Sequence, residues 1–189
     1  MKLEMLEVKY QIELLQLARK TLELHLQGHT RIHLSSESRV LQRKTGAFVT
    51  LHHHGELRGC IGHIISEEPL WHTVKQMAIA AATEDPRFDP VTLDELSKID
   101  IEISVLTPFK KIEDLDEIKV GEHGLMITQG HRRGLLLPQV ASEQGWNRDE
   151  FLAHTCIKAG LHAEAWMDSE TKIEVFSAQV FGEKSTSTK

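Results

Sequence analysis

The sequence predicts an α+β protein in which a mostly antiparallel sheet is flanked by helices. Three observations predict this class. Apolar residues recur at helical spacing near the N-terminus and again over residues 69–83. Strict alternation of apolar and polar residues over 101–105 is typical of a half-buried strand. Two pairs of β-rich segments are separated by only a few turn residues, which favours hairpins over parallel βαβ units.

The composition limits the class of protein. Its 189 residues favour one domain that buries a core without disulfides or a structural metal. Hydrophobic residues make up 40% and charged residues 26%, which disfavours a disordered chain or a coiled-coil rod. A net charge of -6 disfavours nucleic-acid binding, and no apolar run approaches the roughly 20 residues of a membrane span.

The cysteine content and the N-terminus indicate the compartment. Two cysteines, Cys60 and Cys156, are too few for a disulfide-rich scaffold or a four-cysteine zinc site. The charged N-terminus lacks the apolar stretch of a signal peptide. We therefore expect a cytoplasmic protein with both thiols reduced.

The first part of the chain is expected to hold a helix and a hairpin. Leucines at steps of three, four or seven predict an amphipathic helix over 3–27 that stops at Gly28. Residues 29–45 lack periodicity and are predicted as a long exposed connection. Segments 46–51 and 56–65 are β-rich, and the histidine-rich stretch between them is the predicted loop.

A second helix precedes the alternating strand. Ser66 is the predicted N-cap of a helix over 69–83. The stretch 84–90 contains two prolines and cannot remain helical, because proline lacks the N–H that continues a helix. Residues 92–95, Thr-Leu-Asp-Glu, form a predicted capping box ahead of the strand at 101–105.

The next part is expected to hold a second hairpin. Residues 108–122 are charged and predicted as a loop or a short helical turn. A hairpin joins 124–128 to 132–137 across a Gln-Gly-His turn. Pro138 begins a helical piece that ends near Gly145, since proline is favoured at helix starts and glycine at helix ends.

The chain is expected to end with a helix, a strand and a tail. Asn147 starts an N-cap signal for a helix that extends to about Ala159. Residues 173–181 are the last predicted strand. The polar residues 184–189 are predicted to form a disordered tail.

Residues 57–62, Leu-Arg-Gly-Cys-Ile-Gly, form the sharpest local motif. A glycine inside a strand costs about 0.5–1 kcal/mol relative to alanine, so Gly59 and Gly62 indicate a bulge or a close approach of backbone or ligand. Side chains alternate on a regular strand. The expected core face holds Leu57, Gly59 and Ile61, and the other face holds Arg58, Cys60 and Gly62.

Cys60 is the candidate catalytic residue. A guanidinium beside a thiol favours the thiolate, so Arg58 would make Cys60 a nucleophile or a redox thiol. The alternative is a small buried hydrophobe in a tightly packed sheet. His63 would face away from Cys60 on a regular strand, which disfavours a Cys–His pair. Cys156 falls at helical spacing with its apolar neighbours and is expected in the core.

Four arginines lie beside glycine or proline backbone: Arg58, Arg87, Arg132 and Arg133. If they converge, they form a cationic pocket for a carboxylate or phosphate group. Asp85 adjoins this set and completes the candidate binding residues together with Gly59 and Gly62. The alternative is that the arginines form structural ion pairs with nearby acids: Asp85, Glu84 or Glu143.

The triple histidine at 52–54 raises the question of a metal site. His52 and His54 would share a face and could bind an ion that prefers imidazole. No carboxylate or further histidine stands at a suitable ligand spacing beside them, so no metal is predicted. No cofactor is predicted either, because the sequence lacks a Walker loop, GxGxxG, HExxH and GxSxG.

Several ordered blocks of the sequence resemble the AMMECR domain family, which in microbes is also called AmmeMemoRadiSam system protein A. The central block is the Leu-Arg-Gly-Cys-Ile-Gly motif, and the resemblance covers about residues 5–182. The blocks are 48–51, 55–62, 80–88, 101–106, 132–141, 145–146 and 151–160.

The resemblance implies a fold and partners. It implies one α+β domain over residues 1–183 with a larger lobe, a smaller lobe and a cleft between them. It also implies association with a Memo-like protein of dioxygenase-related fold and with a radical S-adenosylmethionine enzyme. Relatives commonly carry charged or polar turn residues in place of the triple histidine, and often a small hydroxyl residue at the position of His63.

Two functional hypotheses follow. The first is an enzyme or enzyme component in which the Cys60 thiolate attacks, or is modified by, a small anionic substrate. That substrate would dock against Arg58, Arg87 and Arg132 or Arg133. The second is a non-catalytic adaptor that binds the Memo-like and radical enzymes and in which the motif is architectural.

Overall fold

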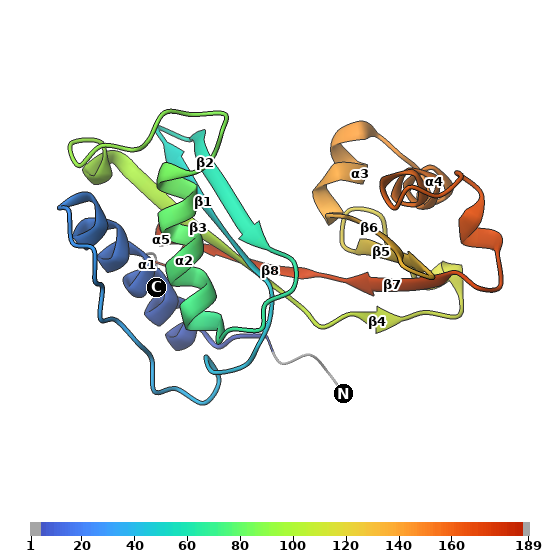
Figure 1. The fold of residues 1–189 in the computed structure, drawn as a ribbon, viewed down its shortest axis with the longest axis horizontal. Coiled ribbons are helices and arrows are strands. Elements are labelled where there is room, and N and C mark those ends of the chain that lie inside the picture. Colours follow the sequence, from blue (N-terminus) through green and yellow to red (C-terminus); the bar gives the residue numbers. More distant parts are fainter. Residues whose placement is uncertain (1–4, 187–189) are drawn as a thin grey trace. The chain divides into compact units, whose positions relative to one another are not determined.

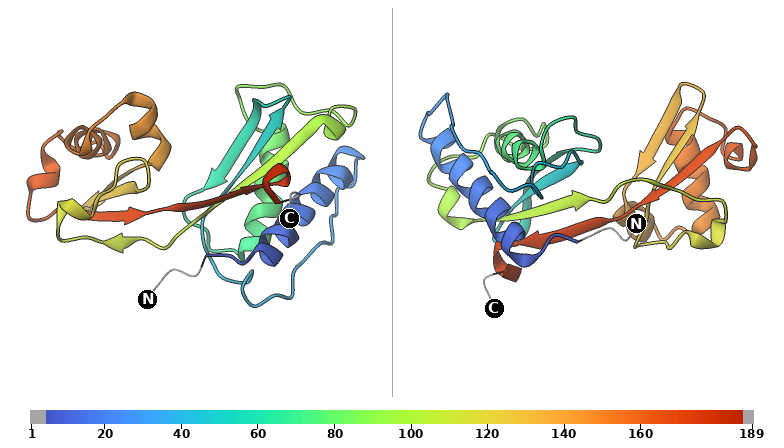
Figure 2. Two further views of the ribbon diagram at one scale, coloured as in Figure 1. Left: turned by 180° about the vertical axis from the view of Figure 1, so that it is seen from behind. Right: turned by 90° about the horizontal axis from the view of Figure 1, so that it is seen from below.

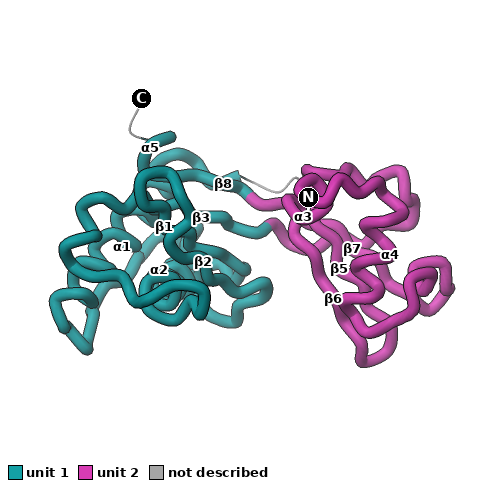
Figure 3. The backbone as a smooth tube through the Cα atoms, turned by 90° about the horizontal axis from the view of Figure 1, so that it is seen from above, with its two compact units in different colours: residues 1–106, 179–189 teal, residues 107–178 magenta. Residues whose placement is uncertain are grey.

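The computed structural model describes residues 5–186. The chain forms two compact units, which Figure 3 distinguishes by colour. Unit 1 comprises residues 1–106 and 179–189, and unit 2 comprises residues 107–178. Each unit has its own four-stranded sheet and its own hydrophobic core. The predicted α+β class with antiparallel pairing is confirmed.

The sheet of unit 1 has the strand order β2-β1-β3-β8. Its strands are β1 (Ala47–His53), β2 (Glu56–His63), β3 (Ile99–Leu106) and β8 (Ala178–Gly182). β1 pairs antiparallel with both β2 and β3. The predicted hairpin and the predicted alternating strand therefore belong to one sheet, and β2 is an edge strand of that sheet.

Two helices bury one face of this sheet. α1 (Val8–Leu26) and α2 (Leu70–Thr83) pack side by side, and Figure 1 and Figure 2 show them from three directions. Strand side chains that join the same core as these helices include Val49, Leu51, Ile101 and Ile103. The intervening side chains are half-buried on the opposite face: Phe48, Thr50, Glu102 and Ser104. The period-2 alternation of the sequence thus marks the two faces correctly.

α1 begins later than the sequence predicts. Val8 is its first residue, and residues 3 and 4 of the expected helix lie outside the described residues. Leu6 is 3% exposed, and its N–H donates to Gln179 Oε1 at 2.7 Å. A tertiary contact therefore holds the segment before α1, although its apolar spacing matches a helix. The predicted stop is confirmed, because Gly28 follows the helix at a φ of 88°.

The first hairpin turns more tightly than the sequence predicts. The expected loop spans 52–55, but the turn consists of His54 and Gly55 alone. Both have positive φ, 54° and 88°, which is the backbone of a type I′ turn. His52 and His53 therefore belong to β1. This turn type matches the right-handed twist of the strands, which explains why the longer loop is not formed.

The prediction of α2 is confirmed, and its predicted cap is wrong. Pro69, not Ser66, occupies the N-cap position. Ser66 Oγ instead accepts a hydrogen bond from the N–H of Glu68 and lies 2.7 Å from Thr73 Oγ1. Ser66 thus stabilises the bend that leads into the helix. The stretch 84–90 is non-helical, as its prolines require.

Unit 2 has a sheet of order β4-β7-β5-β6 covered by short helices. The strands are β4 (Lys110–Lys111), β5 (Gly124–Gln129), β6 (Arg132–Leu136) and β7 (Lys172–Phe176). The helices are α3 (Pro138–Gln144) and α4 (Arg148–Lys158). α4 packs on β5 and β6, and its buried Phe151 and Leu152 join Leu125 and Ile127 in one core. The second predicted hairpin and both predicted helices are confirmed.

Asn147 caps α4 as predicted. Its side chain accepts a hydrogen bond from Glu150 N at 3.0 Å, and Glu150 Oε2 accepts one from Asn147 N at 2.9 Å. This reciprocal pair is a capping box, which satisfies two donors at the start of the helix. Three short 3₁₀ turns complete the secondary structure before the C-terminus: Leu96–Lys98, Leu115–Glu117 and Ala165–Met167.

The last predicted strand is two strands in two sheets. Residues 173–181 contain most of β7 in unit 2 and of β8 in unit 1, with Ser177 between them. The N–H of Ser177 donates to Thr107 Oγ1 at 2.7 Å. Of the predicted tail, residues 184–186 lie in α5 (Glu183–Thr186), and residues 187–189 lie outside the described residues.

Candidate functional site

A β-bulge interrupts β2 inside the Leu-Arg-Gly-Cys-Ile-Gly motif. Leu51 of β1 pairs with Gly59, but the next residue, His52, pairs with Leu57. Arg58 is therefore the extra residue of the bulge. The side chain of Leu57 is consequently out of phase with the core and is 40% exposed, which corrects the predicted core position. The bulge also ends the regular alternation that would place Arg58 and Cys60 on one face.

The two glycines of the motif each allow a close approach. A Cβ on Gly59 would lie 2.0 Å from the carbonyl oxygen of Ala81 in α2. A Cβ on Gly62 would lie 2.2 Å from Cγ of Phe48. Both distances are far below van der Waals contact, so no other residue fits at either position without movement. The motif thus permits α2 to pack directly on the backbone of β2.

Cys60 lies on the sheet face opposite the helices. It is partly exposed, and it pairs across the strands with Thr50, whose hydroxyl donates to Cys60 Sγ at 3.3 Å. Thr50 in turn pairs with Glu102 of β3. A thiol, a hydroxyl and a carboxylate therefore form one cross-strand row. His52 adjoins the row, with Nε2 4.0 Å from Glu102 Oε1.

Asp85 holds the outer edge of β2 at Cys60. Its carboxylate accepts the N–H of Cys60 at 2.8 Å, although Asp85 follows α2 in the sequence. Arg87 donates to the same carboxylate through Nε at 2.9 Å and Nη2 at 2.7 Å, and its Nη2 lies 3.5 Å from the carbonyl oxygen of Cys60. We call this pair the edge clamp. It bonds the backbone of Cys60 as a neighbouring strand would.

The two charges of the edge clamp differ in their exposure to solvent. Hydrogen bonding to Arg87, together with the Cys60 N–H, holds the pKa of Asp85 well below its usual range against the opposing effect of burial. The hydrogen bond to Asp85 raises the pKa of Arg87. The Asp85 side chain is 2% exposed and that of Arg87 is 54% exposed. The clamp therefore presents its cation, not its anion, to the surroundings of Cys60.

Arg58 forms a second ion pair. Its Nε and Nη2 donate to the two carboxylate oxygens of Glu95 at 3.0 and 3.3 Å, and its Nη1 donates to the carbonyl oxygen of Asp89 at 2.8 Å. This bidentate contact with Arg58 is the largest cause that lowers the pKa of Glu95 to about 2. Arg58 thus anchors the connection between α2 and β3 to the bulge.

The remaining predicted arginines lie in unit 2. Arg132 and Arg133 occupy β6, and Arg132 Nη1 donates to the carbonyl oxygen of Gly160 at 2.7 Å. Arg133 is exposed. The structure therefore gathers Asp85 and Arg87 at Cys60, and it places Arg132 and Arg133 in the other unit.

Comparison with known proteins identifies the family. The AMMECR1 family model matches residues 15–181. This chain belongs to the AMMECR1 family. A Methanothermobacter thermautotrophicus protein is 46% identical over 177 residues, with 90% of this chain and 92% of the relative covered. The crystal structure of an uncharacterized protein from Pyrococcus horikoshii has a TM-score of 0.74 and 41% identity, with 93% and 92% of the two chains covered.

Cys156 of this AMMECR1 family member contrasts with Cys60. It is 0% exposed within the core of unit 2, and burial raises the pKa of its thiol. Within residues 5–186, no three His, Cys, Asp or Glu side chains are grouped so that they could hold a metal ion. In the same part of the chain, no helix has the length and apolar character needed to span a bilayer.

Sequence reasoning missed Thr50 and Glu95. Thr50 is opposite Cys60 only because the bulge shifts the register by one residue. The glycines of the motif indicate a bulge or a close approach, but they do not give the position of the register shift. For Glu95, a local sequence motif did exist, but it pointed to a helix cap and not to the site. Its predicted capping box with Thr92 is only half formed. The N–H and hydroxyl of Thr92 both donate to Glu95 Oε2, but the N–H of Glu95 donates to the carbonyl oxygen of Thr92 and not to its side chain. The same carboxylate also binds Arg58, which a local motif cannot indicate.

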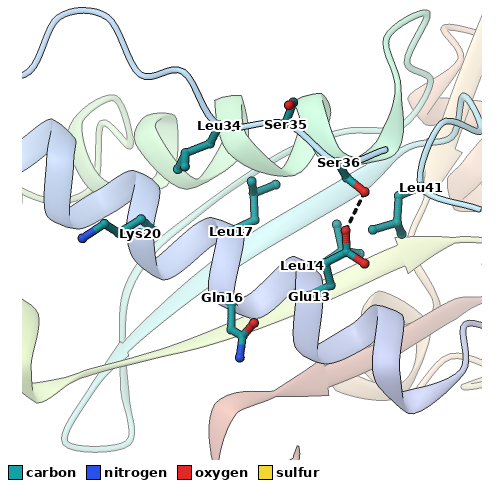
Figure 4. Close-up of a pocket in the computed structure, with 9 residues that line it drawn as sticks. All are labelled: Glu13, Leu14, Gln16, Leu17, Lys20, Leu34, Ser35, Ser36 and Leu41. Carbon is teal, nitrogen blue, oxygen red and sulfur yellow. Dashed lines mark hydrogen bonds between the residues drawn. The ribbon is translucent and has the colours of Figure 1, made fainter. Parts of the chain in front are cut away.

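Unit 1 of the AMMECR1 protein also contains cavities away from Cys60, among them two that adjoin the cross-strand row and α1 respectively. One, of about 390 Å³, adjoins the cross-strand row at His52 and Glu102 and is also lined by residues of β8 and α5. The other, of about 200 Å³, lies between α1 and the connection that follows it (Figure 4). Its walls include Leu14, Leu17 and Leu34, and a hydrogen bond between Ser36 and Glu13 lies on one side.

Proposed function

We propose that this AMMECR1 protein is a thiol-dependent enzyme, or the thiol-bearing component of one, that acts on a small anionic substrate beside Cys60. The observation that carries the proposal is the environment of the Cys60 sulfur. Cys60 is partly exposed, its sulfur accepts a hydrogen bond from Thr50, and the exposed cation of Arg87 is held at its backbone. A thiol-dependent reaction needs a sulfur that the substrate can reach and a cation that binds the charge of the substrate, and Cys60 and Arg87 supply these two groups.

The roles of the site residues differ in this proposal. Cys60 supplies the sulfur that attacks an electrophilic substrate or is modified by it. Arg87 binds the anionic group, because its guanidinium is half-exposed while its partner Asp85 is buried. Arg58 positions the motif strand through Glu95. The backbone N–H of Cys60 takes no part in stabilising an oxyanion, because Asp85 already accepts it.

The first test is the selectivity of thiol alkylation. The native protein is treated with iodoacetamide, and the modified cysteine is identified by peptide mass spectrometry. We expect rapid modification of Cys60 and none of Cys156 until the protein unfolds, because Cys156 is fully buried. Thr50→Val removes the donor to the sulfur at nearly constant volume and should slow alkylation several-fold at neutral pH. Resistance of Cys60 in the folded protein would contradict the proposal.

A second candidate function is an adaptor for a Memo-like protein and a radical S-adenosylmethionine enzyme, the partners that the family implies. The observation that favours it is that both arginines form ion pairs within the protein, Arg58 with Glu95 and Arg87 with Asp85. These pairs give the motif an architectural role. The two candidates differ in their dependence on the thiol. Complex formation by an adaptor should survive Cys60→Ser and be lost on substitution of exposed Arg133. Purified partners that stay separate at micromolar concentration would exclude the adaptor.

Location remains part of the proposal as well. The expected cytoplasmic location agrees with the two unpaired cysteines of the structure. Because a reducing compartment keeps thiols free, it would also preserve Cys60 for the proposed chemistry.

A further inference from the structure

A cavity of about 520 Å³ opens in unit 1 at a place that the Cys60 motif does not reach. It lies between the end of α1, the connection after it and one side of α2. The residues that line it and enter the argument are His25, His29, Thr30, Ile32, Lys75 and Ile79. Its volume falls within the roughly 300–1,000 Å³ of typical small-molecule sites.

The end of α1 forms one wall of this cavity. Gly28 N–H donates to the carbonyl oxygen of His25, and His29 N–H donates to that of Leu24. These two bonds form a Schellman motif, for which the positive φ of Gly28 is required. The motif folds His29 back toward the helical turn that carries His25. It also occupies carbonyl groups that would otherwise repel an anion at this helix end.

The second wall is a stripe along α2. Lys75 and Ile79 are one helical turn apart and therefore lie on the same side of the helix. The ammonium group of Lys75 lies 5.2 Å from the centre of the Trp71 ring. Trp71 packs against the core of unit 1, so this cation–π contact places the ammonium group against a fixed ring.

Three polar groups of the cavity, His25, His29 and Lys75, have no acidic partner among residues 5–186. Neither His25, His29 nor Lys75 forms an ion pair or a side-chain hydrogen bond with any residue of the described range 5–186. Several other cations of unit 1 are paired with carboxylates, among them Lys20 with Glu23, Arg58 with Glu95, and Arg87 with Asp85. The cavity is thus a local excess of donors in a chain whose net charge is -6.

The neighbouring cavity of Figure 4 provides a contrast. It borders the same connection, but its walls include four leucines and a carboxylate, Glu13, that accepts a hydrogen bond from Ser36. Its one lysine, Lys20, is paired with Glu23. The smaller cavity therefore offers an anion no lysine or histidine without a carboxylate partner among the described residues, whereas the 520 Å³ cavity offers three such side chains.

We propose that the 520 Å³ cavity binds a small organic oxyanion, a carboxylate or phosphate group carried on an apolar body. Lys75 supplies the charge, and the imidazoles of His25 and His29 with the hydroxyl of Thr30 supply further donors. Ile32 and Ile79 contact the apolar body. This site shares no residue with the Cys60 site, so an experiment can contradict one proposal and leave the other standing.

The test uses the full-length protein and two probes, inorganic phosphate and acetate, each added at constant pH and ionic strength. Histidine ring signals are followed by NMR and assigned with His25→Gln and His29→Gln. We expect saturable shifts of both histidine signals with at least one probe. Saturation with phosphate alone identifies a phosphoryl group, and saturation with acetate alone identifies a carboxylate. Shifts that stay linear with both probes would overturn the proposal.

Lys75→Gln should weaken the binding roughly tenfold, the size expected when one charge-assisted hydrogen bond is lost. Lys98→Gln is the matched control, because Lys98 is an exposed lysine of the same unit that does not line the cavity. Circular dichroism checks that both variants fold. An unchanged affinity in Lys75→Gln, or an equal loss in Lys98→Gln, would also overturn the proposal.

Discussion

At the scale of single residues, Gly59 and Gly62 set the distances between larger elements. The carbonyl oxygen of Ala81 occupies the space of a side chain at position 59, and the ring of Phe48 occupies it at position 62. The sequence predicts a close approach at these glycines, but not the identity of what approaches. Ala81 belongs to a helix that follows in the chain, and its contact with Gly59 is purely tertiary.

Gly59→Ala should destabilise the protein strongly. The new Cβ would lie 2.0 Å from a backbone oxygen, so α2 or β2 must shift. Overpacking of this kind costs about 1–3 kcal/mol, and a rigid backbone partner favours the upper end. Urea unfolding measures the change. Gly182→Ala is the control, since its nearest atom would be 3.3 Å away and its cost should be small. Equal stability of the two variants would contradict the packing argument.

The candidate site was predictable in its residue types and only partly in its contacts. Cys60, Asp85 and Arg87 were all selected from the sequence, and the structure brings them together. The partnership of Arg58 with Glu95 was not selected, because the two residues are distant in sequence and no periodicity links them. Thr50 was missed because its contact with the sulfur depends on the bulge.

At the scale of elements, the hairpins and the longer helices follow from local signals. The capping box of Asn147, the prolines of 84–90 and the alternation in β3 each act within a few residues, so sequence reasoning finds them. The glycines of the motif indicated a bulge or a close approach, but no local signal gives the position of the bulge at Arg58 or the division of β7 from β8. No proline or glycine separates the two strands at Ser177, and tertiary pairing assigns each half to its sheet.

The connection between α2 and β3 should loosen in acid. Asp85 and Glu95 both have lowered pKa values in the folded protein, chiefly because of Arg87 and Arg58 respectively. A lowered folded pKa means that the stabilisation is present above the ordinary value and is lost as the pH falls toward the folded value. For Glu95 the loss runs from about pH 4.5 down to about pH 2.

Unfolding free energy measured by urea titration between pH 7 and pH 3 tests this expectation. The wild type should lose stability below pH 4.5, and Glu95→Gln should lose less over the same range because its carboxylate is absent. Glu56→Gln serves as the control, since Glu56 is exposed and should follow the wild type. A Glu95→Gln curve with the slope of the wild type would contradict the role of the ion pair.

At the scale of the whole molecule, the two units repeat one topology. Each has a hairpin, a helix and a third strand that pairs with the first strand of the hairpin: β1, β2, α2 and β3 in unit 1, and β5, β6, α4 and β7 in unit 2. In each unit an Arg-Gly pair lies in the second strand, and the glycine contacts the helix. The sequence shows no convincing repeat, because the shared feature is topological.

Gly134→Ala should act on unit 2 as Gly59→Ala acts on unit 1. Its Cβ would lie 2.3 Å from the backbone nitrogen of Ala159 near the end of α4. Because the units have separate cores, hydrogen–deuterium exchange should show reduced protection in β5, β6 and α4 and little change in unit 1. Gly59→Ala should give the reverse pattern. Equal loss of protection in both units would contradict separate cores.

The edge clamp has one further consequence, for how copies of the chain meet. An outermost strand is a template on which a second polypeptide can add its own backbone and start a stack. A strand added at this edge would need the backbone N–H and carbonyl oxygen of Cys60, and Asp85 and Arg87 already contact these two groups. A single aspartate–arginine pair thus blocks the addition of a second chain at this position of the exposed strand.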